Sequence, residues 1–84
     1  MTPSEPVVYL VRFFDPHGAM VLLEWRAPSD RSIETILRDV AFWVVPPGQR
    51  IEDYRFELRR DGAPWDGKRY RVRRLAEVEV IEQQ

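Results

Sequence analysis

The stretch PSDRSIETILRDVAFWVVPPG, residues 28–48, predicts one amphipathic helix with a clear start and a clear end. Asp30 or Ser32 can act as the N-cap, because a short polar side chain accepts a hydrogen bond from a free amide of the first turn. Pro46 and Pro47 cannot donate a helical hydrogen bond, so the helix is expected to end before them. Between these marks apolar residues recur at helical spacing and are expected to be buried: Ile33, Ile36, Leu37, Val40 and Phe42 or Trp43.

Strand patterns lie on both sides of this helix. Residues 7–14 and 19–26 are rich in β-branched and aromatic side chains, and the turn DPHG at residues 15–18 predicts that they form a hairpin. After the helix, apolar and polar side chains alternate in three runs, at residues 51–60, 68–74 and 76–80. The expected fold is therefore α+β, in the order strand, strand, helix and two or three further strands, with these aromatic residues in its core: Phe42, Trp43, Phe56 and Trp65.

The order and spacing of these segments resemble the ubiquitin-like β-grasp family. The run Pro28-Ser29-Asp30 resembles the family's entry into its single helix, and Val45-Pro46-Pro47 resembles the proline pair just after that helix. The glycine-bounded turn at residues 61–67 is similar to the family's turn after its third strand. The resemblance implies one domain over residues 1–84, a mixed sheet of four to five strands packed on one helix, in the order ββαββ(β). Residues 1–6 would be a flexible N-terminal segment.

The same resemblance implies a protein that works by docking to other proteins, such as the small modifier of a bacterial ubiquitination-like pathway. Its partners would be activating and conjugating enzymes. The working end would be the C-terminal tail of Ile81, Glu82, Gln83 and Gln84. This tail departs from the family, whose conjugated members end in a diglycine, whereas the last glycine here is Gly67. Ordinary diglycine conjugation is therefore not expected.

Composition argues against several other classes of protein. The chain of 84 residues contains no cysteine, so neither a disulfide framework nor a thiolate metal site is available. His17 is the single histidine and stands in a turn without suitably spaced partners, so we predict no catalytic residue, metal, cofactor or enzymatic activity. Neither a signal peptide nor an apolar run of about 20 residues is recognisable, which predicts a cytoplasmic protein.

The first hairpin is one candidate surface for partner binding. Both of its faces are apolar, whereas a sheet with one solvated face normally alternates apolar and polar residues. Leu10, Met20 and Leu22 would form an exposed patch on the outer face. A partner protein or a second copy of the chain would cover this patch, unless the N-terminal segment does so. A non-covalent binding module, an adaptor or an inhibitor would use such a surface.

The second candidate surface is basic. Residues 55–74 carry eight basic and three acidic side chains. One face of the paired strands would present an arginine set that attracts an acidic protein or a phosphate backbone, unless glutamates on neighbouring strands neutralise it: Arg55, Arg59, Arg69, Arg71 and Arg73. Nucleic acid is the least favoured partner, because stacking aromatic residues are not interleaved with the arginines and the net charge of the chain is −1.

Overall fold

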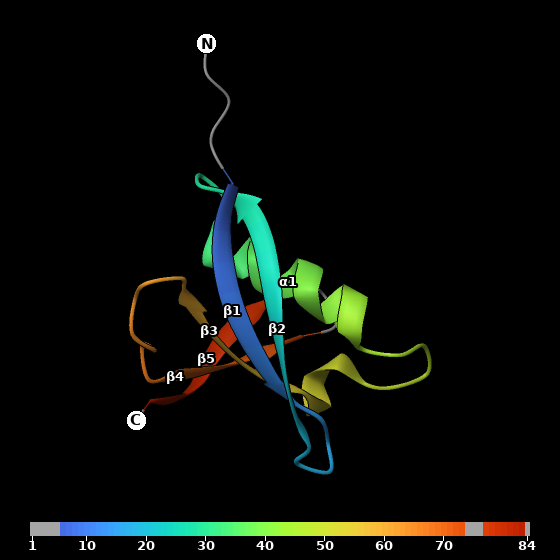
Figure 1. The fold of residues 1–84 in the computed structure, drawn as a ribbon. Helices are drawn as coiled ribbons and strands as arrows, with labels where there is room; N and C mark the ends of the chain where they lie inside the picture. Colours follow the sequence, from blue (N-terminus) through green and yellow to red (C-terminus); the bar gives the residue numbers. More distant parts are fainter. Residues whose placement is uncertain (1–5, 74–76, 84) are drawn as a thin grey trace.

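The computed structural model describes residues 6–73 and 77–83, and it shows a five-stranded sheet with one helix packed on it (Figure 1). The chain begins with a hairpin of β1 (Pro6–Phe14) and β2 (Met20–Pro28), and helix α1 (Ile33–Val44) follows. A short 3-10 helix, η1 (Ile51–Asp53), leads into the remaining strands, which are β3 (Arg55–Arg60), β4 (Lys68–Val72) and β5 (Val78–Gln83).

All neighbouring strands of the sheet pair antiparallel, and the strand order is β2-β1-β3-β4-β5. The predicted β-grasp fold with its mixed sheet is therefore wrong. A parallel pair needs a crossover of roughly a dozen residues or more, but only residues 61–67 and 73–77 link the last three strands. These links are too short for a crossover, so each strand lies beside the preceding one and β5 forms an edge of the sheet.

Helix α1 lies in the connection between β2 and β3. Both strands pair antiparallel with β1, which lies between them, so they run in the same direction and the helix returns the chain to its starting end. Ser32 begins the helix, because its Oγ accepts a hydrogen bond from the amide of Thr35 at 3.2 Å. The helix ends where the amide of Val45 donates to the carbonyl of Ala41 at 3.0 Å, directly before the proline pair.

The core lies between α1 and the inner face of the sheet. Burial of one large apolar side chain stabilises a fold by about 1.5–3 kcal/mol, so a cluster of them holds the helix on the strands. The largest fully buried side chains come from one stripe of α1 and from inward positions of β1, β3 and β4: Val11, Ile36, Leu37, Val40, Phe56 and Val72. The prediction that Phe56 belongs to the core is confirmed.

Other residues expected in the core lie on the surface. Phe42 is 66% exposed, Trp43 is 79% exposed, and Ile33 in the first helical turn is also exposed. Successive helical residues are rotated by about 100°, so Val44 continues the buried stripe while Phe42 falls on the opposite side of the helix. Trp65 is half-buried but packs against arginines on the outer face of the sheet, away from α1.

The residues assigned to a C-terminal tail are part of the sheet. Ile81, Glu82 and Gln83 are the last residues of β5, and the backbones of Glu82 and Gln83 pair with β4. Gln84 and residues 1–5 lie outside the described residues, while Pro6 already belongs to β1. No helix among the described residues has the length and apolar character needed to cross a membrane.

Candidate functional site

The last turn of α1 presents two large aromatic side chains to solvent, at the consecutive positions Phe42 and Trp43. Single exposed apolar residues are common on protein surfaces, whereas adjacent ones mark candidate interaction sites. Phe42 also lines a groove beside the helix end. This combination of exposed aromatic rings and a concave surface makes the end of α1 the first candidate for a functional site.

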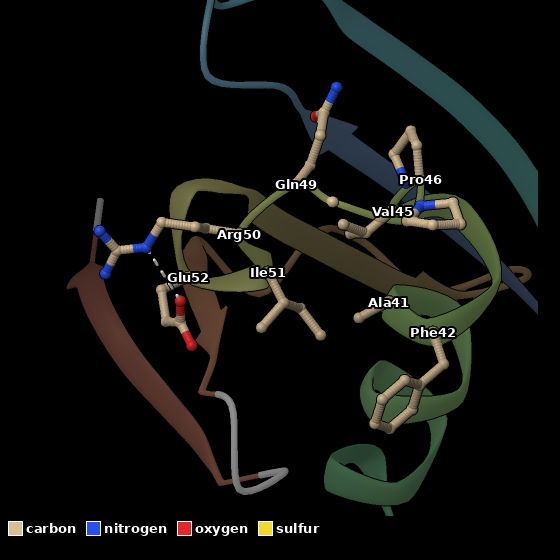
Figure 2. Close-up of a pocket in the computed structure, with 10 residues that line it drawn as sticks. Ala41, Phe42, Val45, Pro46, Gln49, Arg50, Ile51 and Glu52 are labelled. Carbon is tan, nitrogen blue, oxygen red and sulfur yellow. Dashed lines mark ion pairs between the residues drawn. The ribbon is translucent and has the colours of Figure 1, made fainter.

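The groove has a volume of about 590 Å³ and lies between the end of α1 and the loop that leads into η1 (Figure 2). We call it the helix-end groove; it is lined by Ala41, Phe42 and residues 45–52. Figure 2 shows Ala41, Phe42 and Ile51 extending toward a common space, with the ion pair of Arg50 and Glu52 at one side. The volume falls within the range of about 300–1,000 Å³ that is usual for ligand pockets.

The loop that forms the far wall is held by its own backbone. Pro46 and Pro47 restrict φ, and the amide of Gln49 donates to the carbonyl of Pro46 at 3.2 Å, which closes a turn. Gly48 has a φ of 89°, in the left-handed region that residues with a side chain rarely adopt. The sequence PPGQ therefore specifies this turn, and with it the shape of the wall.

Tyr54 connects the same loop to the core. Its hydroxyl donates to Oε1 of Gln49 at 2.5 Å, and its buried ring lies 6.3 Å from the ring of Phe13. Arg55 adds a second connection, because its guanidinium donates to the carbonyl of Glu52 at 2.6 Å. A wall fixed in this way loses little conformational entropy when a ligand binds, so the groove is preorganised.

The groove lies at the negative end of the helix dipole. The last turn of α1 contains no basic side chain that would compensate the partial negative charge of its carbonyl groups. A cation brought to this end is favoured by about 0.3–1 kcal/mol. The two charged residues of the lining, Arg50 and Glu52, face each other, with Nε of Arg50 3.5 Å from the carboxylate of Glu52. The groove therefore suits an apolar group with a basic neighbour.

The residues of the predicted hairpin patch share the outer face of the hairpin but differ in exposure. Met20 and Leu22 are more than half exposed near the hairpin turn. Leu10 is half-buried further along β1, where it lies between Glu24 of β2 and Arg59 of β3. The apolar surface of the hairpin is thus concentrated in the first half of β2 rather than spread over both strands.

The arginines of the predicted basic surface are engaged by neighbouring groups. Arg71 and Arg73 both contact the carboxylate of Glu79, at 3.0 and 2.7 Å. Arg55 donates to the carbonyl of Glu52, and Arg59 donates to the carbonyl of Ala63 at 3.0 Å. Glu79 therefore compensates part of the charge of Arg71 and Arg73, whereas the carbonyl groups that Arg55 and Arg59 contact are uncharged and leave the charge of these arginines in place.

Arg69 and Arg12 lie around Glu57, a buried carboxylate on the outer face of the sheet. The ring of Trp65 packs on the arginines beside Glu57, with the guanidinium carbon of Arg12 at 4.0 Å and that of Arg59 at 5.5 Å from the ring centroid. We call Arg12, Glu57, Trp65 and Arg69 the outer-face cluster. Because the buried carboxylate of Glu57 lies between two arginines, the cluster stabilises the sheet and compensates part of their positive charge.

The acidic residues and the single histidine were also compared with the requirements of a metal site. No group of three or more histidine, cysteine, aspartate or glutamate residues there could hold a metal ion. His17 is exposed in the hairpin turn, where its backbone amide donates to Oδ1 of Asp15 at 2.8 Å. Its position matches the prediction of a solvent-exposed turn residue.

Comparison of the chain with protein-family models, with curated proteins and with solved structures finds no match. The helix-end groove therefore has to be interpreted from its own chemistry. The groove was not predicted from the sequence, because Phe42 and Trp43 were expected in the core. For Phe42 the signal was present, because Val44 extends the buried stripe at helical spacing and leaves Phe42 off it. Trp43 follows Ile36 by seven residues and so stands at the margin of the stripe, where spacing alone does not predict its exposure.

Proposed function

We propose that this domain is a protein-binding module whose helix-end groove receives an apolar side chain of its partner. The observation that carries the proposal is the exposure of Phe42 and Trp43 beside a preformed groove. Tryptophan is enriched among the residues that dominate binding energy at protein interfaces. Folding does not account for these two side chains, because most of their surface remains in water.

The chemistry of the groove defines the partner segment. The apolar side chains of Phe42, Val45 and Ile51 favour an aliphatic or aromatic anchor. Burying roughly 100 Å² of apolar surface there contributes about 2.5 kcal/mol to binding. The negative end of α1 favours a lysine or arginine beside that anchor. We propose the cytoplasm as the compartment, because a chain without cysteine makes no use of an oxidising environment.

Covalent modification and nucleic-acid binding gain no support from the geometry. The modifier hypothesis used the residues from Ile81 onward as a working end, but Ile81, Glu82 and Gln83 belong to β5. The nucleic-acid hypothesis used the arginine set, but Glu57 and Glu79 lie among those arginines. Docking to another protein is the part of the sequence-based hypothesis that we retain.

A displayed library of random peptides, selected on the immobilised domain, tests this function. Selected peptides should share an apolar anchor with an adjacent lysine or arginine. Their affinity, measured by isothermal titration calorimetry, should fall at least about tenfold for Trp43→Ala and for Phe42→Ala, which corresponds to about 1.4 kcal/mol.

Ile33→Ala is the matched control, because Ile33 is an exposed apolar residue at the opposite end of the same helix. This variant should bind the selected peptides as the original chain does. Peptides that bind the Trp43 and Phe42 variants with unchanged affinity would show that the groove is not the binding site.

A further inference from the structure

The free edge of β2 takes no part in the proposed function. We infer that β2 pairs with β2 of a second copy of this chain, which joins two sheets into one continuous antiparallel sheet. Within residues 6–73 and 77–83, β1 is the one strand that pairs with β2, so β2 is an edge strand of the described sheet. The proposal concerns a surface distinct from the helix-end groove, and each can fail without the other.

The first half of β2 lacks the features that normally protect an edge. Native edge strands are usually short, bulged, or interrupted by lysine or proline. β2 has nine residues, pairs with β1 in continuous register, and carries no charge from Met20 to Leu23. Met20, Val21 and Leu22 are 55%, 47% and 56% exposed. Both faces of this half-strand are therefore apolar and in contact with solvent. Pairing with another strand satisfies the free backbone groups and places further side chains beside these residues on both faces.

The hydrogen bonds of the hairpin show which backbone groups point to the free edge. The amide of Asp15 donates to the carbonyl of Ala19 at 3.0 Å, and bonded pairs alternate along an antiparallel ladder. Beyond β1, the carbonyl of Val8 accepts a bond from the amide of Asp61 at 2.8 Å, on the side of β3. The same alternation directs the amide and carbonyl groups of four residues outward from β2: Met20, Leu22, Glu24 and Arg26.

When a two-fold axis passes through Leu23, the outward backbone groups of these four residues in one copy face those of the same four residues in the second copy. Met20 then faces Arg26 of the second copy and Leu22 faces its Glu24, so about eight hydrogen bonds form in all. An axis at Glu24 would place two glutamates opposite each other, which is destabilising. An axis at Trp25 would draw Pro28, which has no amide hydrogen, into the ladder. The axis at Leu23 avoids both problems and uses the full charge-free segment.

The inner face leaves room for this arrangement. The backbone of α1 comes near β4 and β5, which β1 and β3 separate from β2 in the sheet. Leu23 and Trp25 only partly reach the core, and Val21 is exposed beside them. In the paired state Val21 faces Trp25 of the second copy, so apolar area on this face is buried as well.

Disulfide trapping tests the register, and the absence of cysteine from the chain makes the test unambiguous. Leu23→Cys places two thiols opposite each other at a non-bonded pair with a Cα separation of roughly 4.5–5.5 Å, which a disulfide can bridge. Val21→Cys is the control, because its counterpart across the axis is Trp25. Under mild oxidation, Leu23→Cys should form a covalent dimer at least about tenfold faster than Val21→Cys. Equal rates would overturn the register at Leu23.

Sedimentation equilibrium of the unmodified full chain tests the association itself. The original chain should show a concentration-dependent dimer, and Leu22→Lys should raise the dissociation constant about tenfold or more, because it places a charge on the edge. Trp43→Lys alters an even more exposed apolar residue outside the edge and should leave the dimer unchanged. A chain that stays monomeric up to millimolar concentration, or a dimer lost in Trp43→Lys but kept in Leu22→Lys, would overturn the proposal.

Discussion

The outer-face cluster allows a quantitative prediction for Glu57→Gln. This substitution keeps the size of the side chain and removes the charge between Arg12 and Arg69. The side chain of Glu57 is only 6% exposed, and the two arginine side chains are 32% and 28% exposed. Removing one partner of a buried ion pair costs about 3–5 kcal/mol. The partial exposure of the arginines reduces this cost, because water screens part of the interaction. We therefore expect Glu57→Gln to lower the free energy of unfolding by about 2–4 kcal/mol.

A second glutamate of the same sheet provides the matched control. Glu79 also contacts two arginines, Arg71 and Arg73, but its side chain is 35% exposed. Exposed pairs contribute about 0.2–1 kcal/mol each, so Glu79→Gln should cost no more than about 1–2 kcal/mol. The two variants share the change in charge and the number of arginine contacts, and they differ in burial.

Urea denaturation followed by tryptophan fluorescence measures both losses. For a domain of this size, 1 kcal/mol corresponds to about 4–8 °C in melting temperature, so Glu57→Gln should melt roughly 10–30 °C lower than the original chain. If Glu79→Gln were as destabilising as Glu57→Gln, burial would not be the cause. If neither variant changed the midpoint, the outer-face cluster would contribute nothing to stability.

Four further substitutions test other parts of the structure. Ser32→Ala removes the N-cap and should lower the free energy of unfolding by about 1 kcal/mol in urea titrations. Gly48→Ala places a side chain at positive φ in open space, so backbone strain alone should lower it by about 1–2 kcal/mol. Burial, together with the hydrogen bond to Asp66, raises the pKa of Tyr70 to about 12. The stability that this shift reflects is complete below a pH of about 10 and is lost as the pH rises toward 12; Tyr70→Phe should flatten that decline, and an unchanged alkaline melting curve would contradict it. Trp43→Ala should change the free energy of unfolding by less than about 0.5 kcal/mol, because the side chain is largely in solvent.

Local structure follows closely from the sequence where short-range chemistry decides it. The turn DPHG forms the predicted hairpin, and Ser32 and Pro46 bound the helix as their capping and helix-ending properties require. The alternation after the helix also predicts burial, since Tyr54, Phe56 and Leu58 all lie in the core. Each of these features depends on residues only a few positions apart, so one sequence suffices to predict it.

Strand pairing was not predictable from the same patterns. Alternation at residues 76–80 predicts a strand, but it does not show whether that strand pairs with β1 or with β4. The β-grasp resemblance implied a mixed sheet. The link after β4 is too short for a parallel crossover, and β5 pairs antiparallel with β4. The length of the link between the last two strands was therefore the feature that decided the pairing. The expected fold followed the family resemblance instead. The position of β2 at an edge depends on the same strand pairing, so it could not be predicted from the sequence patterns either.

The position of Phe42 and Trp43 connects stability with function. An apolar side chain in the core is retained because its removal unfolds the protein, and Ile36, Leu37 and Val40 already fill that role on α1. Phe42 and Trp43 contribute little to folding and expose apolar area that promotes non-specific association. A small domain gains from such residues only when a specific ligand covers them. The loop of residues 45–52, fixed by Gly48 and tied to the core by Tyr54, shapes the surface beside Phe42. A rigid wall next to two exposed rings is the arrangement that selective burial of a partner's side chain requires.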